Sequence, residues 1–269
     1  MSLNIPKLFI QYSKSHPALI RQRKEFIHYL GGGMAVKLFL RVQKISPNVR
    51  TKDTTDFDFV FAVPNKLSNS EMKLKFSAMD RMMSRHVNGF QKWLLEKYKV
   101  PSAITKEDLV PPVRYNPITK KEIYRVIQYK IQVVGMKPEG LVDSTLAYVP
   151  GVRRYQLLDK YTAKFGMPIQ RLKYLYKGVL TLLASSFSSF AIKDPSLGSR
   201  NPLTGSRKEK GLKNTARITN LMRAQSRAST AAQKLVKHIK NGNVEQAYKD
   251  ANRVLKNLAT SIKKSSPRV

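Results

Sequence analysis

The clearest alternation of apolar and polar residues lies in the segment Thr54–Phe61. Phenylalanine occupies positions 57, 59 and 61, while Asp56 and Asp58 occupy the alternate positions. Successive side chains of a β-strand point to opposite faces of the sheet. The pattern therefore predicts a strand that turns its phenylalanines into a core and both carboxylates to the other face.

A longer, helical period follows this strand. Between Ser70 and about Lys99, apolar residues recur every three or four positions, which predicts a long helix with one face packed on the sheet. These residues are Met72, Phe76, Met79, Met83, Phe90 and Leu94.

A glycine turn precedes the strand with the two aspartates. Glu25–Leu30 is rich in aromatic and branched residues and stops at Gly31, Gly32 and Gly33, which predicts a strand that ends in a tight turn. Apolar spacing in Met34–Lys44 predicts a helix just after the glycines. The glycines permit positive φ and close approach of a ligand, and the start of the helix directs free N–H groups towards it.

The central part of the chain predicts a hairpin. Glu122–Val134 and Leu141–Val149 alternate in character on either side of a turn, which indicates two antiparallel strands. The preceding Pro101–Pro117 is predicted to be a loop-rich connection, because Pro111 and Pro112 disfavour regular structure.

The remainder is predicted to be helical. The expected helices are Tyr155–Phe165, Ile169–Ile192, residues 208–240 and residues 244–264, with Asn241, Gly242 and Asn243 as C-cap, turn and N-cap of the last two. The fold class is therefore α+β, a mixed sheet flanked by helices and followed by a basic all-helical C-terminal region. The expected divisions are an α+β domain at 1–150, a helical extension at 151–192, a linker at 193–206 and a basic helical hairpin tail at 207–269.

Composition adds a strong constraint on partners. The 269 residues are 42% hydrophobic, enough for a sizeable core, and 50 Lys and Arg against 17 Asp and Glu give a formal charge of +33. A chain this basic repels itself unless a polyanion screens it, so we expect a nucleic acid or an anionic membrane surface as partner.

Several classes of protein are excluded. The absence of cysteine rules out disulfide scaffolds, thiolate zinc sites and cysteine nucleophiles, and the four histidines are scattered. No signal peptide opens the chain, and the longest uncharged stretch, Gly178–Ile192, is shorter than the roughly 20 residues of a spanning helix. We therefore expect no transmembrane segment and no secretion.

The paired aspartates point to metal chemistry. Two carboxylates held side by side repel each other, and a divalent cation such as Mg²⁺ neutralises them. Asp143 lies on the second hairpin strand among apolar neighbours, where a solvated carboxylate is out of place, so a third ligand position is a natural use for it. The pattern favours phosphoryl or nucleotidyl transfer.

The order of these motifs resembles the nucleotidyltransferase superfamily of DNA polymerase β, the poly(A) polymerases and the nucleotidyltransferase toxins. Residues 31–33 match its glycine turn, Asp56 and Asp58 its paired ligands, and Asp143 its third ligand. The resemblance implies a nucleotidyltransferase-like sheet over about residues 20–150, a nucleoside triphosphate substrate, and Mg²⁺ or Mn²⁺ bound by the three catalytic carboxylates. Candidate phosphate contacts on the helix after the glycines are Lys37 and Arg41.

The chain departs from that superfamily at two places. Gly33 and Met34 stand where it usually has Ser or Thr, so one hydroxyl contact to phosphate is missing, and the distance from Gly32 to Asp56 is longer than usual. The second half, from Phe165 to the basic helices, looks similar to nucleotidyltransferase-like proteins of large nucleocytoplasmic DNA viruses. That resemblance implies a location in the virion or in the virus factory of the host cytoplasm.

The basic tail has the character of a phosphate-binding segment. Its cations are irregularly spaced with few aromatic residues between them, which favours contacts to a nucleic-acid backbone over base readout. The candidates are Arg207, Lys208, Lys210, Lys213, Arg217, Arg223 and Arg227.

Two functions stay open at this point. One is a template-independent enzyme that adds nucleotides to an RNA or DNA end by two-metal catalysis. The other is a catalytically inactive minor capsid or virion protein that uses the nucleotidyltransferase-like body as a building block and contacts genome, membrane or neighbouring capsid proteins through its basic tail. The observation that separates them most cheaply is whether the three aspartates converge around a vacant pocket or are filled in by other side chains and salt-bridged.

Overall fold

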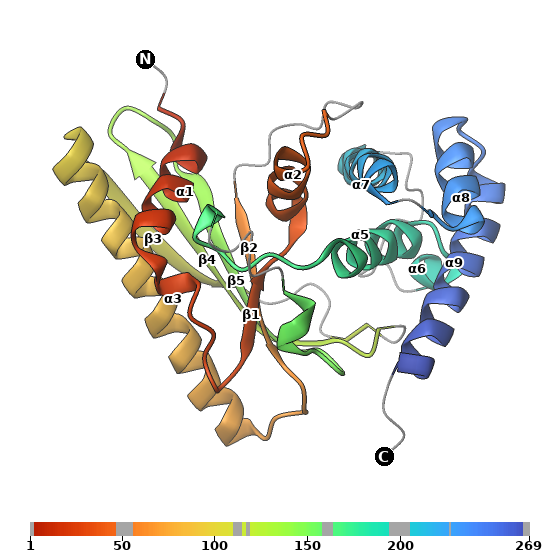
Figure 1. The fold of residues 1–269 in the computed structure, drawn as a ribbon, viewed down its shortest axis with the longest axis horizontal. Helices are drawn as coiled ribbons and strands as arrows, with labels where there is room; N and C mark the ends of the chain where they lie inside the picture. The colour runs from red at the N-terminus through yellow and green to blue at the C-terminus, as the bar shows by residue number, and fades with distance from the viewer. Residues whose placement is uncertain are drawn as a thin grey trace. The chain divides into compact units, whose positions relative to one another are not determined.

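A computed structural model describes residues 3–46, 56–109, 115–116, 119–157, 164–193, 205–225 and 227–265. The chain divides into two compact units (Figure 1). The first comprises Met1–Ala35, Thr54–Tyr115 and Lys121–Arg171, and the second comprises Val36–Asp53, Asn116–Lys120 and Leu172–Val269. Helix α2 (Gly32–Val42) belongs to both units, because the division falls within it.

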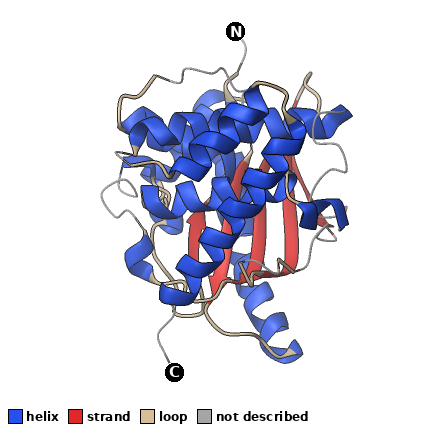
Figure 2. Ribbon diagram, turned by 90° about the vertical axis from the view of Figure 1, so that its right-hand side faces the viewer, coloured by secondary structure: helices blue, strands red, loops and turns tan. Residues whose placement is uncertain are grey.

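The first unit is built on a mixed five-stranded sheet. The strands are β1 (Ile27–Leu30), β2 (Phe57–Val63), β3 (Ser102–Leu109), β4 (Glu122–Val133) and β5 (Glu139–Tyr148). Their order in the sheet is β1-β2-β5-β4-β3, with β2 and β5 parallel and every other neighbouring pair antiparallel (Figure 1). Figure 2 shows the strands in red among the helices. The predicted mixed sheet, flanked by helices and followed by a helical region, is confirmed.

One face of the sheet carries the main core of this unit. Phe57, Phe59 and Phe61 are fully buried there, as the alternation predicted. Helices α1 (Ile5–Ser15) and α3 (Asn69–Tyr98) cover this face, and Phe9 of α1 lies 4.8 Å from Phe57 and 5.1 Å from Phe90 of α3, ring centre to ring centre (Figure 1).

The long helix α3 has a well-defined start. The Ser68 hydroxyl accepts a hydrogen bond from the backbone N–H of Glu71, and the Glu71 carboxylate accepts one from the backbone N–H of Ser68. This capping box satisfies two N–H groups that would otherwise lack partners at the helix end.

The opposite face of β2 is divided between a small core and a polar end. Ala62 packs in a cluster with Tyr29, Val152 and Leu157, and Val60 packs against it. Asp58, two residues before Val60 on the same face, stays partly exposed. The two aspartates therefore stand at the end of a face that is otherwise covered.

The second unit is helical. Its helices are α5 (Leu172–Ser186), α6 (Ser189–Lys193), α7 (Gly205–Ala224), α8 (Thr230–Lys240) and α9 (Val244–Ser265). Asn241 ends α8, Gly242 has a φ of +71°, and the Asn243 side chain accepts from the N–H of Gln246, which confirms the predicted cap and turn.

A contact between a histidine and a buried aspartate joins the last two helices. His238 Nδ1 of α8 and Asp250 Oδ2 of α9 are 2.7 Å apart, and the Asp250 side chain is 1% exposed. This contact fixes one end of the antiparallel α8–α9 pair, whose facing surfaces bury residues such as Leu235 and Val254.

The predicted loop over Pro101–Pro117 was wrong in its first half, because Ser102–Leu109 forms strand β3 at the edge of the sheet. Most of this strand is exposed, so it shows little apolar alternation. Cross-strand ion pairs hold it to β4 instead, Glu107 with Lys130 at 2.8 Å and Asp108 with Arg125. Residues 111 and 112 lie outside the described part of the chain.

Helix boundaries after Pro150 also differ from the prediction. Residues 154–156 form a 3₁₀ turn, residues 158–163 lie outside the described part of the chain, and Ile169 pairs with Leu30 of β1 in place of starting a helix. The Leu30 N–H donates to the Pro168 carbonyl at 2.7 Å, so this segment is drawn to the sheet edge and α5 begins only at Leu172.

The single helix predicted over residues 208–240 is two helices. A break separates α7 from α8, and the Ser229 hydroxyl caps α8 by accepting from the N–H of Ala232. Of the predicted linker, residues 194–204 lie outside the described part of the chain. No helix among the described residues is long and apolar enough to cross a membrane.

Candidate metal centre

The parallel pairing of β2 with β5 brings distant carboxylates together. Asp58 of β2 and Asp143 of β5 are direct register partners, and Asp56 immediately precedes β2. All three side chains are partly exposed, and one carboxylate oxygen from each lies within 4.8 Å of the others. The three predicted ligands therefore converge on the face of the sheet opposite the phenylalanines.

The glycine turn packs directly against this cluster. The Gly31 N–H donates to the Asp58 carbonyl at 2.7 Å. Gly32 has a φ of +58°, in the left-handed region, and a Cβ at that position would overlap the Asp58 carboxylate. Position 32 thus requires glycine for two reasons: its backbone conformation, and the space beside it that the Asp58 carboxylate occupies.

The helix after the turn starts earlier than predicted. Helix α2 begins at Gly32, so Gly33 lies inside its first turn, whereas the apolar spacing predicted a start at Met34. Met34 itself is buried. The N–H groups of this first turn have no partner within the helix, which is the arrangement that favours a phosphate or a carboxylate.

Gln128 of β4 forms a hydrogen bond with the third carboxylate, Asp143. It is the register partner of Asp143, and its Nε2 donates to Asp143 Oδ1 at 2.9 Å. Burial raises the pKa of Asp143, the Gln128 hydrogen bond lowers it, Asp56 raises it further and Lys130 lowers it, with a net rise. Ionising Asp143 is therefore disfavoured by burial and by its acidic neighbour, a cost that a bound cation removes.

Lys121 is electrostatically coupled to Asp58. Burial lowers the pKa of this lysine, and the Asp58 carboxylate acts in the opposite direction. Neither Lys121 nor Gln128 was predicted from the sequence as part of the site. The signal for Gln128 was a polar residue in a predicted strand, but its pairing with Asp143 depends on a register that two irregularities in the β4–β5 ladder adjust.

The donor set suits a hard divalent cation. Mg²⁺ and Mn²⁺ prefer oxygen ligands, and Mg²⁺ keeps several waters when one or two carboxylates hold it. Three carboxylates that are partly open to solvent provide such ligands while leaving coordination positions for substrate oxygens. The residues present therefore fit the metal that the sequence analysis predicted.

The other two predicted phosphate contacts lie further along α2. Lys37 and Arg41 are exposed on α2, one helical turn apart, in the part of that helix assigned to the second unit. Their contact with phosphate stays a prediction.

The predicted nucleic-acid residues of the tail differ among themselves. Lys208, Lys210 and Arg227 are exposed, while Lys213 and Arg217 are partly buried. Arg217 donates to the Asn214 side chain at 3.2 Å, and Arg223 donates to the Ser46 carbonyl at 2.8 Å. The side chain of Arg207 lies outside the described part of the structure. Nucleic-acid binding by this set stays a prediction.

Comparisons with known proteins found distant structural likenesses. No protein-family model and no curated protein sequence matches the chain. A crystal structure described as a candidate nucleotidyltransferase from Helicobacter pylori aligns at 10% identity and a TM-score of 0.34, over 100% of each chain. The structure of JHP933 from Helicobacter pylori aligns at 10% identity and a TM-score of 0.33, over 96% of this chain and 92% of that one. Likenesses this distant assign no function.

Replacing Gly32 by alanine tests the packing of the turn. We expect Gly32→Ala to displace the Asp58 carboxylate and to abolish any rise in melting temperature on adding Mn²⁺. Gly135→Ala is the matched control, because Gly135 also has a positive φ, +80°, but a Cβ there meets nothing within 4 Å. The control is expected to cost only the left-handed backbone penalty of about 1–2 kcal/mol. Equal losses of stability and an unchanged response to Mn²⁺ in both variants would contradict this account.

Replacing Asp143 by asparagine tests the electrostatics of the cluster. The pKa of Asp143 is raised by folding, so its contribution to stability is present at low pH and is lost as pH rises through that pKa. In EDTA at pH 7, Asp143→Asn should therefore be more stable than the wild type, with the difference shrinking below about pH 4. Mg²⁺ or Mn²⁺ at about 100 times its Kd should stabilise the wild type by about 2.7 kcal/mol and leave the variant unchanged.

Asp80→Asn provides the contrasting control for this experiment. Burial raises the pKa of Asp80, but hydrogen bonds from Lys106, Tyr129 and Ser84 outweigh it and lower the pKa overall. Loss of this carboxylate is expected to destabilise the protein at pH 7 with or without metal. Melting curves across pH measure both variants, and a destabilised Asp143→Asn protein in EDTA would refute the predicted sign.

Proposed function

We propose that the protein is a metal-dependent nucleotidyltransferase that adds nucleotides to the end of a nucleic acid without a template. The observation that carries this proposal is the convergence of Asp56, Asp58 and Asp143 within 4.8 Å beside a glycine turn. Reactions at a phosphate need negative charge neutralised on attacking and leaving oxygens, and a carboxylate cluster of this kind holds the cations for that purpose.

Mg²⁺ or Mn²⁺ bound by the three aspartates would neutralise charge on the triphosphate of the substrate nucleotide. Asp58, fixed between Gly31, Gly32 and its partner Asp143, is the best-positioned ligand of the three. Asp143, the register partner of Asp58, is also the candidate to take the proton of an attacking hydroxyl.

The glycine turn and α2 would hold the triphosphate. The first N–H groups of α2 begin at Gly32, beside the carboxylates, and supply the positive end of the helix dipole. Lys37 and Arg41 are the candidate side-chain contacts further along this helix. Gly33 provides no hydroxyl, so in this protein the backbone N–H groups would carry that part of phosphate binding.

A second function is favoured by Lys121. Lys121, coupled to Asp58, supplies positive charge to that carboxylate from within the chain, so a protein without activity would not depend on a bound cation alone to stabilise it. Such a protein would serve as a basic minor capsid or virion component that contacts genome, membrane or capsid proteins. A viral origin, and with it a place in the virion or virus factory, is part of this proposal and rests on sequence resemblance.

Asp58→Asn is the decisive variant for the enzymatic proposal. We expect wild-type protein with Mg²⁺ or Mn²⁺ to incorporate labelled nucleoside triphosphates into RNA or DNA primers, and EDTA to abolish incorporation. Loss of one metal ligand costs several kcal/mol of transition-state stabilisation, about a thousandfold in rate. Asp108→Asn, which removes an exposed carboxylate on β3, should keep full activity. A well-folded wild type that incorporates no nucleotide with either metal, or an active Asp58→Asn variant, would overturn the proposal.

Gln128 offers a test of how the third carboxylate is oriented. Gln128→Ala removes the 2.9 Å hydrogen bond to Asp143 and is expected to weaken Mn²⁺ affinity or activity about 10–100-fold, as is usual for residues that orient a metal ligand. Gln132→Ala, on the same strand but exposed, is the matched control. Calorimetric titration with Mn²⁺ measures the effect, and equal affinities for the two variants would show that Gln128 has no such role.

A further inference from the structure

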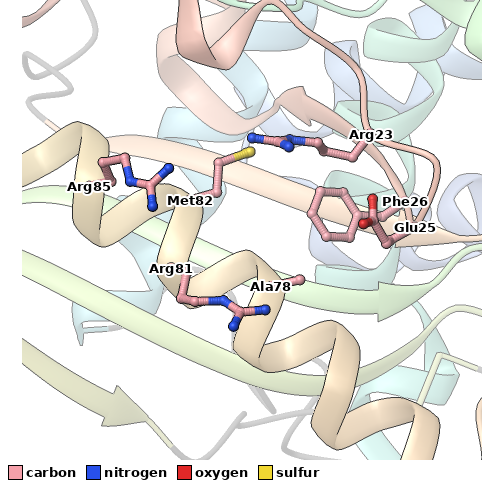
Figure 3. Close-up of a pocket in the computed structure, with 7 residues that line it drawn as sticks. All are labelled: Arg23, Glu25, Phe26, Ala78, Arg81, Met82 and Arg85. Carbon is pink, nitrogen blue, oxygen red and sulfur yellow. The ribbon is translucent and has the colours of Figure 1, made fainter.

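Three arginines gather at a hollow in the first unit, on the side of the sheet covered by α3. Arg81 and Arg85 lie one turn apart on α3, and Arg23 lies in the segment before β1 (Figure 3). The hollow has a volume of about 170 Å³, and Figure 3 shows the Arg23 guanidinium directed towards Met82 and Arg85. Positive charge from two distant parts of the chain is thus concentrated at one recess.

These guanidinium groups are not neutralised within the described structure. None of the three takes part in an ion pair or donates a hydrogen bond among the described residues, although elsewhere in this unit Lys106, Arg125 and Lys130 are paired with carboxylates. Glu25 is the one carboxylate among the residues lining the recess, and in Figure 3 it lies beside Phe26, away from Arg85. An anion would therefore find unused donors here.

A second hollow of about 350 Å³ continues the first. It shares Arg23, Met82 and Arg85 with it and extends to Tyr12 and His16 at the end of α1. We call the two hollows together the arginine groove. Its floor is uncharged near neutral pH, because burial lowers the pKa of His86 to about 3, and the positive charges stand along its rim.

The far end of the groove has an aromatic platform. The His16 ring is stacked on Tyr12, with ring centres 4.3 Å apart and planes 22° apart, and His16 is exposed while Tyr12 is buried. Grooves that bind single-stranded nucleic acid combine a row of cations along the backbone with exposed rings on which bases stack. Arg81 and Arg85, with Cβ atoms ~5–6 Å apart as helix neighbours, form such a row.

The groove is distinct from the carboxylate cluster. Helix α3 packs on the phenylalanine face of β2, whereas Asp56 and Asp58 face the other way. A nucleotide bound at the carboxylates cannot also occupy the groove. The groove therefore suits a longer polyanion held away from the site of chemistry.

We propose that the arginine groove binds the phosphate backbone of a single-stranded nucleic acid, with Arg23, Arg81 and Arg85 as phosphate contacts and His16 as a base-stacking ring. Guanidinium groups bind phosphate oxygens in a bidentate manner, which explains arginine at all three positions. The site does not require the carboxylate cluster to be active, so it serves an enzyme or a packaging protein equally.

The test is binding of the full-length protein to a fluorescent single strand of about 20 nucleotides over a range of salt concentrations. For single strands, each phosphate contact contributes about 0.7 to the slope of log affinity against log salt. The variant Arg81→Gln/Arg85→Gln is expected to bind at least about tenfold more weakly, with a slope shallower by about 1.4. Lys73→Gln/Lys92→Gln removes the same charge from exposed positions of the same helix and should retain the wild-type slope.

Further arms separate this proposal from its alternatives. His16→Ala should weaken single-strand binding without changing the salt slope, because stacking releases no counterions. Asp58→Asn should bind as the wild type does, so failure of the enzymatic proposal leaves this result unaffected. The proposal would be overturned if the two double variants weakened single-strand binding equally. It would also be overturned if the arginine double variant weakened binding to a duplex and to vesicles of anionic lipid as much as binding to the single strand. Unchanged melting curves establish that the variants are folded.

Discussion

The parallel pairing of β2 with β5 is the interaction on which the arrangement of the first unit depends. It joins segments more than 80 residues apart and sets Asp58 directly beside Asp143 in register. A shift of one residue would turn the side chains of β2 to opposite faces and separate the carboxylates. The phenylalanines enforce the register, because they are fully buried against α1 and α3 only when the aspartates face the other way.

The same alternation gives the two faces of the sheet different chemistry. One face is apolar under α1 and α3, and the arginines of α3 stand on the far side of that layer. The other face carries the carboxylates, with a glycine turn packed against Asp58 so closely that no side chain fits. Opposite charges are therefore kept apart by a hydrophobic layer, which prevents the arginines of the groove from neutralising the aspartates.

The cost of this arrangement lies in the carboxylate cluster. Burial and Asp56 together raise the pKa of Asp143, while Gln128 and Lys130 only partly compensate. Clusters of like charge that folding brings together without full compensation are typical of sites that serve a ligand. Lys121, coupled to Asp58, offers partial electrostatic relief from within the chain.

Much of the sheet was predictable, because alternation in β2 and the hairpin of β4 and β5 reflects side chains that are buried on one face and open on the other. The edge strand β3 was missed because it lacks such a contrast between a buried and an open face. Most of its residues are exposed, and the ion pairs to β4 that hold it depend on partners about 20 residues away. The break before α8 was missed because Ser229 acts through a local cap rather than through apolar spacing.

The sequence by itself identified Asp56, Asp58 and the glycines as candidates, since strand alternation and a glycine turn are local patterns of residue type and spacing. Only the tertiary structure decided that Asp143 lies beside them, that Gln128 and Lys121 interact with these carboxylates, and that Arg23 lines the same recess as Arg81 and Arg85. The local repeat of apolar residues predicts which face of a strand or helix a side chain lies on. The partner it meets there is set by strand order, register and helix packing, which arise from contacts between segments far apart in the chain.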